Sequence, residues 1–157
     1  MQRYFIELFS PDKWKWFTYN NFQKTVIKTW KLTTVAHYLR PGDVLIHYLS
    51  KGHSLVMGYS TIKEIISISK KDSGYWVYLS VEPTKILQEG LPGRRVFEKT
   101  NAYKALRQTK DWTGLVNGSL REHTSIDGKI ITDQVDRVFE ANAAHIGMQR
   151  RLDLLSK

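Results

Sequence analysis

The residues in this sequence that could do chemistry are tryptophans with lysine nearby, a pattern that recurs at separate places along the chain. The residues are Trp14, Trp16, Trp30 and Trp112, next to Lys13, Lys15, Lys31 and Lys110. An aromatic face can stack on a nucleobase, which contributes about 1–3 kcal/mol per base, and a nearby ammonium can pair with a phosphate. These tryptophans lie in or beside expected loops, so the pattern predicts a surface that binds nucleic acid. The alternative for each is packing in the core, because its side chain buries a large area.

The segment FSPDKWKWFTYNN, residues 9–21, holds two of these tryptophans in what is expected to be a loop. We expect one of Trp14 and Trp16 to face a ligand and the other to pack inward. The fifth tryptophan, Trp76, lies in the alternating run YWVYLSV on the same strand face as Tyr78, and we expect it to serve packing rather than ligand contact.

The charge of the chain also favours a polyanionic partner. There are 24 Lys and Arg residues against 15 Asp and Glu residues, which gives a formal net charge of +9 and a pI near 9.7. A basic domain attracts polyanions, and nucleic acid is the commonest polyanion inside a cell. The alternative is a basic surface that is merely solvated.

Sequence motifs for catalysis are absent. There is no GxxxxGK(S/T) or GxGxxG phosphate loop and no GxSxG nucleophile motif. A chain without cysteine has neither a thiol nucleophile nor a thiolate metal ligand, and the five histidines form no HxH or HExxH pair. His47 is expected to face solvent or a cleft, and Asp133 and Asp136 to lie on a solvated helix face. We therefore expect a protein that is not an enzyme and that uses no cofactor and no metal.

The chain length fits one domain, residues 1–157. The opening residues have no apolar core or cleavage site typical of a secretory signal, and no run approaches the roughly 18 apolar residues of a membrane span. We therefore expect a soluble cytoplasmic protein without a membrane partner.

The hydrophobic pattern predicts an α+β fold in which strands are interspersed with helices. The expected strands are residues 3–9, 43–49, 54–69 with Gly58 as a bulge or close-approach point, 75–81 extending towards 87, and 115–122. The expected helices are residues 18–28, 33–39, 96–108, 127–145 and 148–155, and the expected loops are 69–74 and 88–95. Short connections between consecutive strands favour antiparallel pairing. The architecture is then a curved antiparallel β-barrel or sheet with peripheral helices. We expect the last helices to dock on the sheet, with self-association through them as the alternative.

Several spaced motifs in the chain match the pattern of a known family. They are YFIELFSPDKW (4–14), KTWKL (28–32), LRPGDVLIHYL (39–49), SLVMGYSTIKEI (54–65), VYLSVEPTKIL (77–87) and TKDWTGLVNGSLREHT (109–124). In this order and spacing they resemble the EVE domain family of the PUA-like superfamily, which also contains the YTH and ASCH domains. Asp111 stands where the family usually has asparagine. The resemblance covers residues 3 to about 139.

The resemblance implies a PUA-like barrel with a pocket for a flipped methylated base, either N6-methyladenine or a 5-modified cytosine. It favours DNA, because EVE-like domains often serve as specificity modules of modification-dependent restriction systems. The partner would then be a nuclease or motor subunit, fused or associated. The alternatives are an RNA-binding domain acting in RNA modification or turnover, and a small-molecule or interaction module that retained the fold.

The resemblance also implies which residues form the base pocket. By analogy with YTH proteins, Trp30 would be one wall, with the backbone of Lys31 beside it, Ser10 would supply a polar contact, and Trp14 or Trp16 would replace the second wall. The residues at the family's other recurrent positions, expected to line or buttress the pocket, are Tyr48, Trp112, Ser119 and Arg121. A basic rim that holds flanking phosphates is expected from Lys13, Lys15, Lys28, Lys31, Arg94 and Arg95.

Overall fold

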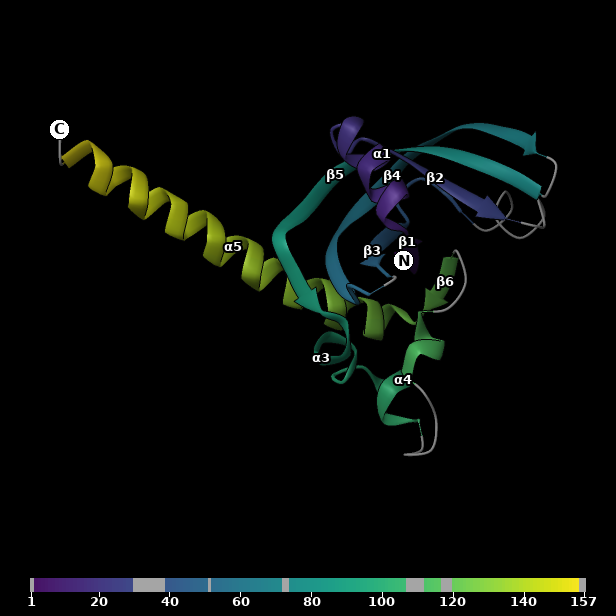
Figure 1. Cartoon of the computed structure of the whole chain (residues 1–157). Helices are drawn as coiled ribbons and strands as arrows, with labels where there is room; N and C mark the ends of the chain where they lie inside the picture. Colours follow the sequence, from purple (N-terminus) through teal and green to yellow (C-terminus); the bar gives the residue numbers. More distant parts are fainter. Residues whose placement is uncertain are drawn as a thin grey trace.

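The computed structural model describes residues 2–29, 39–50, 52–71, 74–106, 112–116 and 120–155, with side chains except at 145–147. Its strands form one curled sheet, and its helices lie at the periphery (Figure 1). The elements in chain order are β1 (Tyr4–Phe9), α1 (Pro11–Tyr19), β2 (Lys24–Thr29), β3 (Val44–Leu49), β4 (Leu55–Lys71), β5 (Gly74–Pro92), α3 (Gly93–Phe97), α4 (Asn101–Lys104), a 3-10 turn (Trp112–Leu115), β6 (Leu120–His123) and α5 (Ser125–Leu155).

The sheet has the strand order β2-β5-β4-β3-β1-β6, and its neighbouring strands are antiparallel except β1 and β3. β4 and β5 are the longest strands, with 17 and 19 residues. Their pairing shifts register repeatedly between residues 56 and 67, and such bulges bend a strand and increase its twist. The sheet therefore curls into a half-barrel, which confirms the predicted α+β fold.

Gly58 marks a close approach between β4 and β5, as the sequence predicts. Its φ is +146°, and a Cβ atom at this position would lie 2.0 Å from the carbonyl oxygen of Lys85. No side chain fits that space, so the bend between the two strands requires glycine.

Both faces of the central strands are covered, which explains their continuous apolar sequences. On β1, Tyr4 and Ile6 pack in a core that α3 and α5 cover. Phe5 and Phe9 alternate with them and pack in a second core, which α1 covers. Every residue of β3 is buried. The site described below lies beside the second core.

The structure corrects the prediction that residues 9–21 form a loop. α1 begins at Pro11 because Ser10 caps it: the Oγ atom of Ser10 accepts a hydrogen bond of 3.2 Å from the backbone N–H of Lys13. Proline at the first helical position needs no hydrogen-bond partner for its nitrogen. The helix stops before Asn21, whose φ is +54°. Ser10 and Pro11 therefore form a standard helix start, although the aromatic residues of the segment favoured a binding loop in the sequence.

The predicted helix over residues 18–28 is also wrong, because Lys24–Thr29 forms β2. The run Thr25-Val26-Ile27 is β-branched throughout and favours extended backbone. β2 pairs with β5 along its whole length, so tertiary pairing also supports the strand. Of the predicted helix over residues 33–39, all but Leu39 lies outside the described residues.

Other predicted boundaries change in the second half of the chain. Residues 88–92 continue β5 instead of forming a loop, and the predicted helix over residues 96–108 is replaced by the short helices α3 and α4. The predicted strand over residues 115–122 is partly the 3-10 turn and partly β6. The two C-terminal helical pieces are one helix, α5.

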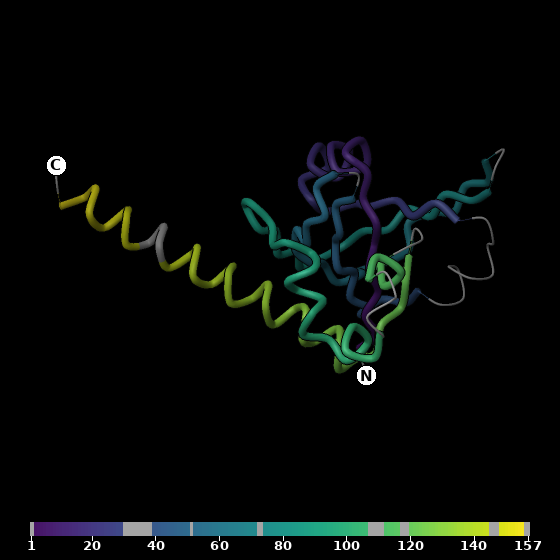
Figure 2. The backbone as a smooth tube through the Cα atoms, turned by 60° about the horizontal axis from the view of Figure 1, so that its bottom comes forward, coloured from purple at the N-terminus to yellow at the C-terminus, as the bar shows by residue number. Residues whose placement is uncertain are grey.

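α5 packs on the sheet only through its first half. Figures 1 and 2 show its C-terminal half projecting away from the body of the molecule. Residues 140–144 and 148–155 are all exposed, so the predicted docking of the last helical segment on the sheet is wrong. No helix in the described ranges has the length and apolar character that a membrane span requires.

Candidate functional site

α1 separates the two tryptophans of the opening segment because residues two apart on a helix point about 200° apart. Trp14 turns inward, where its ring packs edge-on against Phe9 at 5.3 Å and Phe17 at 5.7 Å between centroids. Trp16 turns towards the sheet and meets Tyr78 of β5 at 6.2 Å. One tryptophan is thus structural, and the other faces the open side of β2 and β5.

The outer face of β2 and β5 places lysine beside aromatic rings. In the register of this pair, Val26 lies opposite Tyr78 and Lys28 lies opposite Trp76. The ammonium of Lys28 lies 4.5 Å from the centroid of the Trp76 ring, and that of Lys71 lies 5.0 Å from it. Cations over an indole face gain from the ring's negative quadrupole, so the strand pair holds positive charge next to flat aromatic surface.

These side chains surround a cavity of about 290 Å³, which we name the Trp16 pocket. Its lining residues come from the start of α1 and from strands β2 and β5: Ser10, Asp12, Lys13, Trp16, Val26, Lys28, Trp76 and Tyr78. Ligand sites usually range from about 300 to 1,000 Å³, so this volume suits a single flat ring system rather than a large cofactor. The lining offers aromatic faces for stacking and ammonium groups for anions.

Lys13 is held at the pocket by a buried carboxylate. Its Nζ atom lies 2.8 Å from Oε2 of Glu7, donates to the carbonyl of Leu8 at 3.3 Å, and lies 4.5 Å from the centroid of the Phe9 ring. Burial opposes the ionisation of Glu7, but Lys13 and His47 outweigh it and lower the pKa of Glu7 to about 2. Glu7 is therefore ionised at neutral pH. Burial also lowers the pKa of Lys13, against the opposing effect of Glu7.

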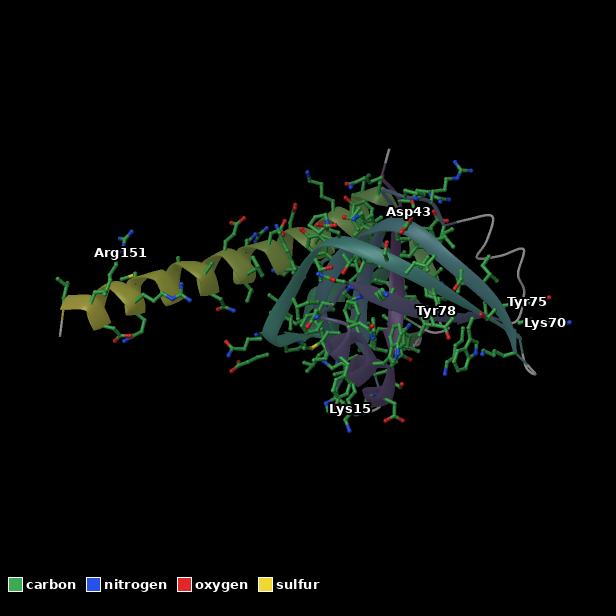
Figure 3. The ribbon with its side chains drawn as sticks, turned by 90° about the horizontal axis from the view of Figure 1, so that it is seen from above. Lys15, Asp43, Lys70, Tyr75, Tyr78 and Arg151 are labelled. Carbon is green, nitrogen blue, oxygen red and sulfur yellow. The ribbon has the colours of Figure 1, made fainter. Side chains whose placement is uncertain are left out.

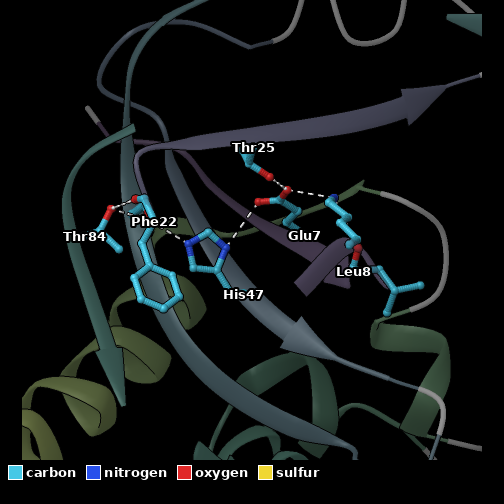
Figure 4. Close-up of polar contacts among 8 residues, drawn as sticks. Glu7, Leu8, Phe22, Thr25, His47 and Thr84 are labelled. Atoms are coloured by element: carbon cyan, nitrogen blue, oxygen red, sulfur yellow. Dashed lines mark hydrogen bonds and ion pairs between the residues drawn. The ribbon is translucent and has the colours of Figure 1, made fainter. Parts of the chain in front are cut away.

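A chain of polar side chains extends from Glu7 across the inside of the sheet (Figure 4). Thr25 donates a short hydrogen bond to Oε2 of Glu7, and Nδ1 of His47 lies 3.2 Å from Oε1 without the alignment of a hydrogen bond. Nε2 of His47 lies 2.6 Å from Oγ of Ser60. Ser60 in turn contacts Thr84 at 2.8 Å. The prediction that His47 faces solvent or a cleft is wrong, because it is fully buried.

The order Ser60–His47–Glu7 has the connectivity of a nucleophile, a base and an orienting acid. All three side chains have no exposed surface, and none of them lines the Trp16 pocket. A nucleophile must reach its substrate, so this burial favours a structural role. The chain of contacts links the central strands of the sheet and fixes the carboxylate that orients Lys13.

Four of the residues expected at the site from the sequence line the Trp16 pocket together: Ser10, Lys13, Trp16 and Lys28. Trp14 packs behind it in the core. Lys15 is exposed on α1 (Figure 3), outside the pocket lining. Trp30, Lys31 and Ser119 lie outside the described residues.

The other expected residues lie elsewhere in the fold. Tyr48 and Trp112 pack with Phe97 in the core that α3 covers. The centroid of the Phe97 ring lies 6.2 Å from that of Tyr48 and 5.9 Å from that of Trp112. Arg94 and Arg95 are exposed on α3, and Arg94 pairs with Glu98 at 3.4 Å. Arg121 is exposed on β6, which forms the opposite edge of the sheet from β2.

Sequence reasoning missed several lining residues, above all Trp76 and Tyr78. Alternation correctly placed these two on one strand face, because Val77 and Leu79, which alternate with them, are buried on the other face. It could not show that this face stays partly open beside α1. A signal for Glu7 was present, since it is a lone carboxylate within the apolar strand YFIELF, and such a group needs a buried partner.

Comparisons with known proteins inform the fold. No protein-family model matches the chain, and no curated protein matches it significantly. Among solved structures it is similar to the YTH domain of Mmi1 in complex with RNA, with 11% identity over 90% of this chain and 82% of that one and a TM-score of 0.57. It is also similar to a point mutant of ZmASCH from Zymomonas mobilis, with 8% identity over 83% of this chain and 95% of that one and a TM-score of 0.56. Rpa0253 from Rhodopseudomonas palustris gives 13% identity over 87% and 94%, with a TM-score of 0.55.

At these identities the likeness concerns the fold. The chain has the curled half-barrel with peripheral helices that these ASCH and YTH structures share, in agreement with the curved sheet and peripheral helices that the sequence predicts.

Proposed function

We propose that this protein binds nucleic acid and holds one base in the Trp16 pocket. The observation that carries the proposal is the cavity itself: about 290 Å³, lined by Trp16, Trp76 and Tyr78. A base stacked on these rings gains about 1–3 kcal/mol. That gain offsets the few kcal/mol needed to take a base out of a duplex stack.

The charges around the pocket suit the sugar-phosphate backbone of the ligand. Lys28 and Lys71 lie over the Trp76 ring, where they can move aside for a base and pair with its flanking phosphates. Lys13 differs from them because Glu7 fixes its position. A fixed ammonium is suited to an acceptor atom on the base edge, whereas mobile lysines are suited to phosphates.

We propose further that the bound base is modified, with N6-methyladenine and 5-modified cytosine as the two candidates. The EVE-like motifs support DNA as the polymer and a role as the specificity domain of a modification-dependent restriction system, with a nuclease or motor subunit as partner. The role is binding without catalysis. RNA is the second candidate, supported by the likeness to the YTH domain of Mmi1, which was solved in complex with RNA.

A binding panel tests the proposal. One labelled oligonucleotide sequence, plain or carrying N6-methyladenine, 5-methylcytosine or 5-hydroxymethylcytosine, is titrated as duplex DNA, single-stranded DNA and RNA by fluorescence anisotropy. Trp16→Ala should weaken binding by roughly 5- to 150-fold, the equivalent of one stacking contact. Tyr19→Ala is the matched control, because Tyr19 lies on the same helix and is 85% exposed.

The outcomes separate the alternatives. Preference for one modified duplex supports the DNA reader, and preference for a modified RNA supports the second candidate. Equal affinity for plain and modified strands contradicts the recognition of a modified base but is consistent with binding of a base in the Trp16 pocket. No binding at low salt, or a Trp16→Ala variant that binds like the Tyr19→Ala control, contradicts the proposal.

A further inference from the structure

A second hollow lies directly beside the Trp16 pocket. It has a volume of about 250 Å³, and we name it the Ile66 hollow. Its lining residues are Trp16, Asn20, Lys24, Ile66, Ser67 and Tyr78. Trp16 and Tyr78 also line the first pocket, so the two concavities are neighbours on either side of one aromatic pair.

Strand geometry gives the two hollows the same chemistry at a regular spacing. Trp76 and Tyr78 are two residues apart on β5, about 6.6 Å, and both face outward. On β2, Lys28 lies opposite Trp76, and Val26 lies opposite Tyr78. Lys24 lies two residues before Val26, at the end of β2 beside the Ile66 hollow. Each hollow therefore combines an aromatic face with a lysine, as a repeated binding unit would.

Ile66 adds apolar surface that nothing in the fold explains. It is 45% exposed and lies at a bulge, between the β4 residues that pair with Leu79 and Tyr78. A single exposed isoleucine is ordinary. This one lines a concavity with two aromatic rings, where the face of a base would cover it.

We propose that the Ile66 hollow binds the nucleotide next to the one held in the Trp16 pocket, so that the ligand presents two successive unpaired bases. This inference rests on the proposed function and adds that the bound segment of the nucleic acid is single-stranded. A base flipped from an intact duplex leaves its neighbours stacked in the helix, so it would fill only the first pocket. A single-stranded segment or loop would fill both.

The test compares two hairpin oligonucleotides that differ only in having one or two unpaired nucleotides at the bulge. Wild-type protein should bind the second about 5-fold or more tightly than the first, the low end of one added stacking contact. Ile66→Asp should abolish that advantage without weakening binding of the first hairpin. Ile68→Asp is the matched control, because Ile68 is on the same strand and 41% exposed but pairs opposite the inward-facing Val77.

The results distinguish this inference from the proposed function. If Trp16→Ala weakens binding of the first hairpin but the second unpaired base adds nothing in wild type, the Ile66 hollow is not a subsite and the base pocket stands. An advantage that survives Ile66→Asp also overturns the inference. Absence of binding to both hairpins overturns both.

The projecting half of α5 carries a second, independent inference. Its apolar residues Ala141, Ala144, Met148, Leu152 and Leu155 fall within about 80° of one another on the helix, and all are exposed. Met148 is 63% exposed and Leu155 is 82% exposed. We name these residues the α5 stripe.

The α5 stripe is not a continuation of the face that packs on the sheet. Ile131 and Val135 mark the packed face, and at 3.6 residues per turn its centre lies roughly 120° from the centre of the stripe. A helix that needs only one buried face has no reason to carry a second apolar face. The stripe therefore indicates a partner.

The pattern of the stripe fits a second copy of the same chain. Around Met148 it is self-complementary: in an antiparallel pair, Ala141 would lie opposite Leu155 of the other copy, and Ala144 opposite Leu152. Small residues facing large ones allow two helices to pack closely. Glu140 and Arg151 lie on the same edge of the stripe, and the same edges of two antiparallel helices face each other, so their opposite charges are complementary.

We propose that two copies of the chain associate through antiparallel pairing of their α5 stripes. Figure 3 shows Arg151 on the projecting part of α5, at the opposite end of the molecule from Lys70 and Tyr75. A dimer of this kind would hold two nucleic-acid sites at opposite ends of the assembly and free of each other. It is a C2 arrangement, in which the same patch serves both copies.

Sedimentation velocity over a wide range of protein concentration tests the pairing. Wild type should shift from monomer to dimer, and Met148→Glu should stay monomeric, because it places two carboxylates at the centre of the pair. Leu154→Glu is the control: Leu154 is 71% exposed but lies about 120° around the helix from Met148, outside the stripe. A monomeric wild type, or a Met148→Glu variant that dimerises like Leu154→Glu, overturns the proposal.

The absence of native cysteine allows the orientation to be tested directly. Ala141→Cys protein mixed with Leu155→Cys protein should form mainly mixed disulfide dimers on oxidation. Predominant dimers of each variant with itself would show parallel pairing and contradict the antiparallel arrangement.

Discussion

Two aromatic clusters that contain tryptophan, one under α3 and one on the outer face of β2 and β5, look alike in sequence but differ in how far neighbouring elements cover them. Beneath α3, the rings of Tyr48, Phe97 and Trp112 contact one another, and Gly93 packs so closely against them that a Cβ atom there would lie 2.7 Å from the Tyr48 ring. On the outer face of β2 and β5, Trp16 and Trp76 line an open pocket instead.

The difference comes from what covers each cluster. α3 and the 3-10 turn cover the first: Tyr48 and Phe97 are buried, and Trp112 is half-buried against them. α1 covers only part of the second, and lysines rather than apolar side chains close the remainder. A tryptophan in a motif therefore indicates either packing or binding, and the neighbouring element decides which.

The cluster under α3 should show the largest effect on stability. Phe97→Ala should lower the free energy of unfolding by about 3–5 kcal/mol, because it leaves a cavity in a fully buried core. Urea unfolding measures the change. The folded fraction should keep wild-type affinity for nucleic acid, and selective loss of binding in a stable variant would show that this cluster also contacts the ligand.

Removing the charge of Glu7 should cost nearly as much. Glu7→Gln leaves the ammonium of Lys13 without its buried partner, which typically costs about 3–5 kcal/mol. The loss should fall near the lower bound, because glutamine keeps an acceptor for Thr25. Glu7→Gln should also weaken binding, because Lys13 loses its fixed position.

The pH dependence of stability offers an independent check on Glu7. The folded pKa of about 2 lies below the ordinary value of 4.5, so ionised Glu7 stabilises the fold fully above pH 4.5 and less as the pH falls towards 2. Wild type should lose stability across this window, and Glu7→Gln should lose less. Identical pH profiles for the two proteins would contradict the assigned pKa.

The open cluster should respond in binding rather than in stability. Trp76→Ala should reduce affinity by roughly 5- to 150-fold, equivalent to one stacked base, while the midpoint of urea unfolding changes little because the ring is only half-buried. Tyr75→Ala changes the neighbouring residue on the opposite strand face and serves as the control. Equal losses from both variants would mean that Trp76 supports the strand rather than the ligand.

The smallest effect should come from the lysines at the rim. Lys28→Gln should weaken binding similarly for all sequences and reduce the slope of log affinity against log salt by about 1. Arg95→Gln, on α3 and outside the Trp16 pocket, should leave the slope unchanged. If Arg95→Gln reduced the slope and Lys28→Gln did not, the phosphates of the ligand would lie along α3 instead.

The sequence predicted the fold better than the site. Alternation and β-branched runs identified β1, β3, β4 and β5, since those signals come from the strands themselves. α1 was not predicted, because its many aromatic and lysine residues favoured a binding loop, although Ser10-Pro11 is a helix start signal. The projection of α5 could not be predicted, because an apolar helical face does not show whether it meets its own sheet or another molecule.

The pocket depends on contacts that the sequence does not display. Ser10, Lys13, Trp16 and Lys28 were expected at a binding site from their types and from the family resemblance. Their common location depends on the crossing of α1 over β2, which is a tertiary relation. Trp76 and Tyr78 join them through strand register, and no local pattern reveals that the face they share is open.

The most direct test of the central claim follows the side chains of the tryptophans themselves. In ¹H–¹⁵N spectra, the indole N–H signals, assigned by single Trp→Phe variants, are recorded during titration with a short unpaired oligonucleotide. The signals of Trp16 and Trp76 should shift together, while those of Trp14 and Trp112 stay in place. A shift of Trp112 with Trp16 and Trp76 unmoved, or no shift of any of these signals at saturating oligonucleotide, would contradict the Trp16 pocket as the binding site.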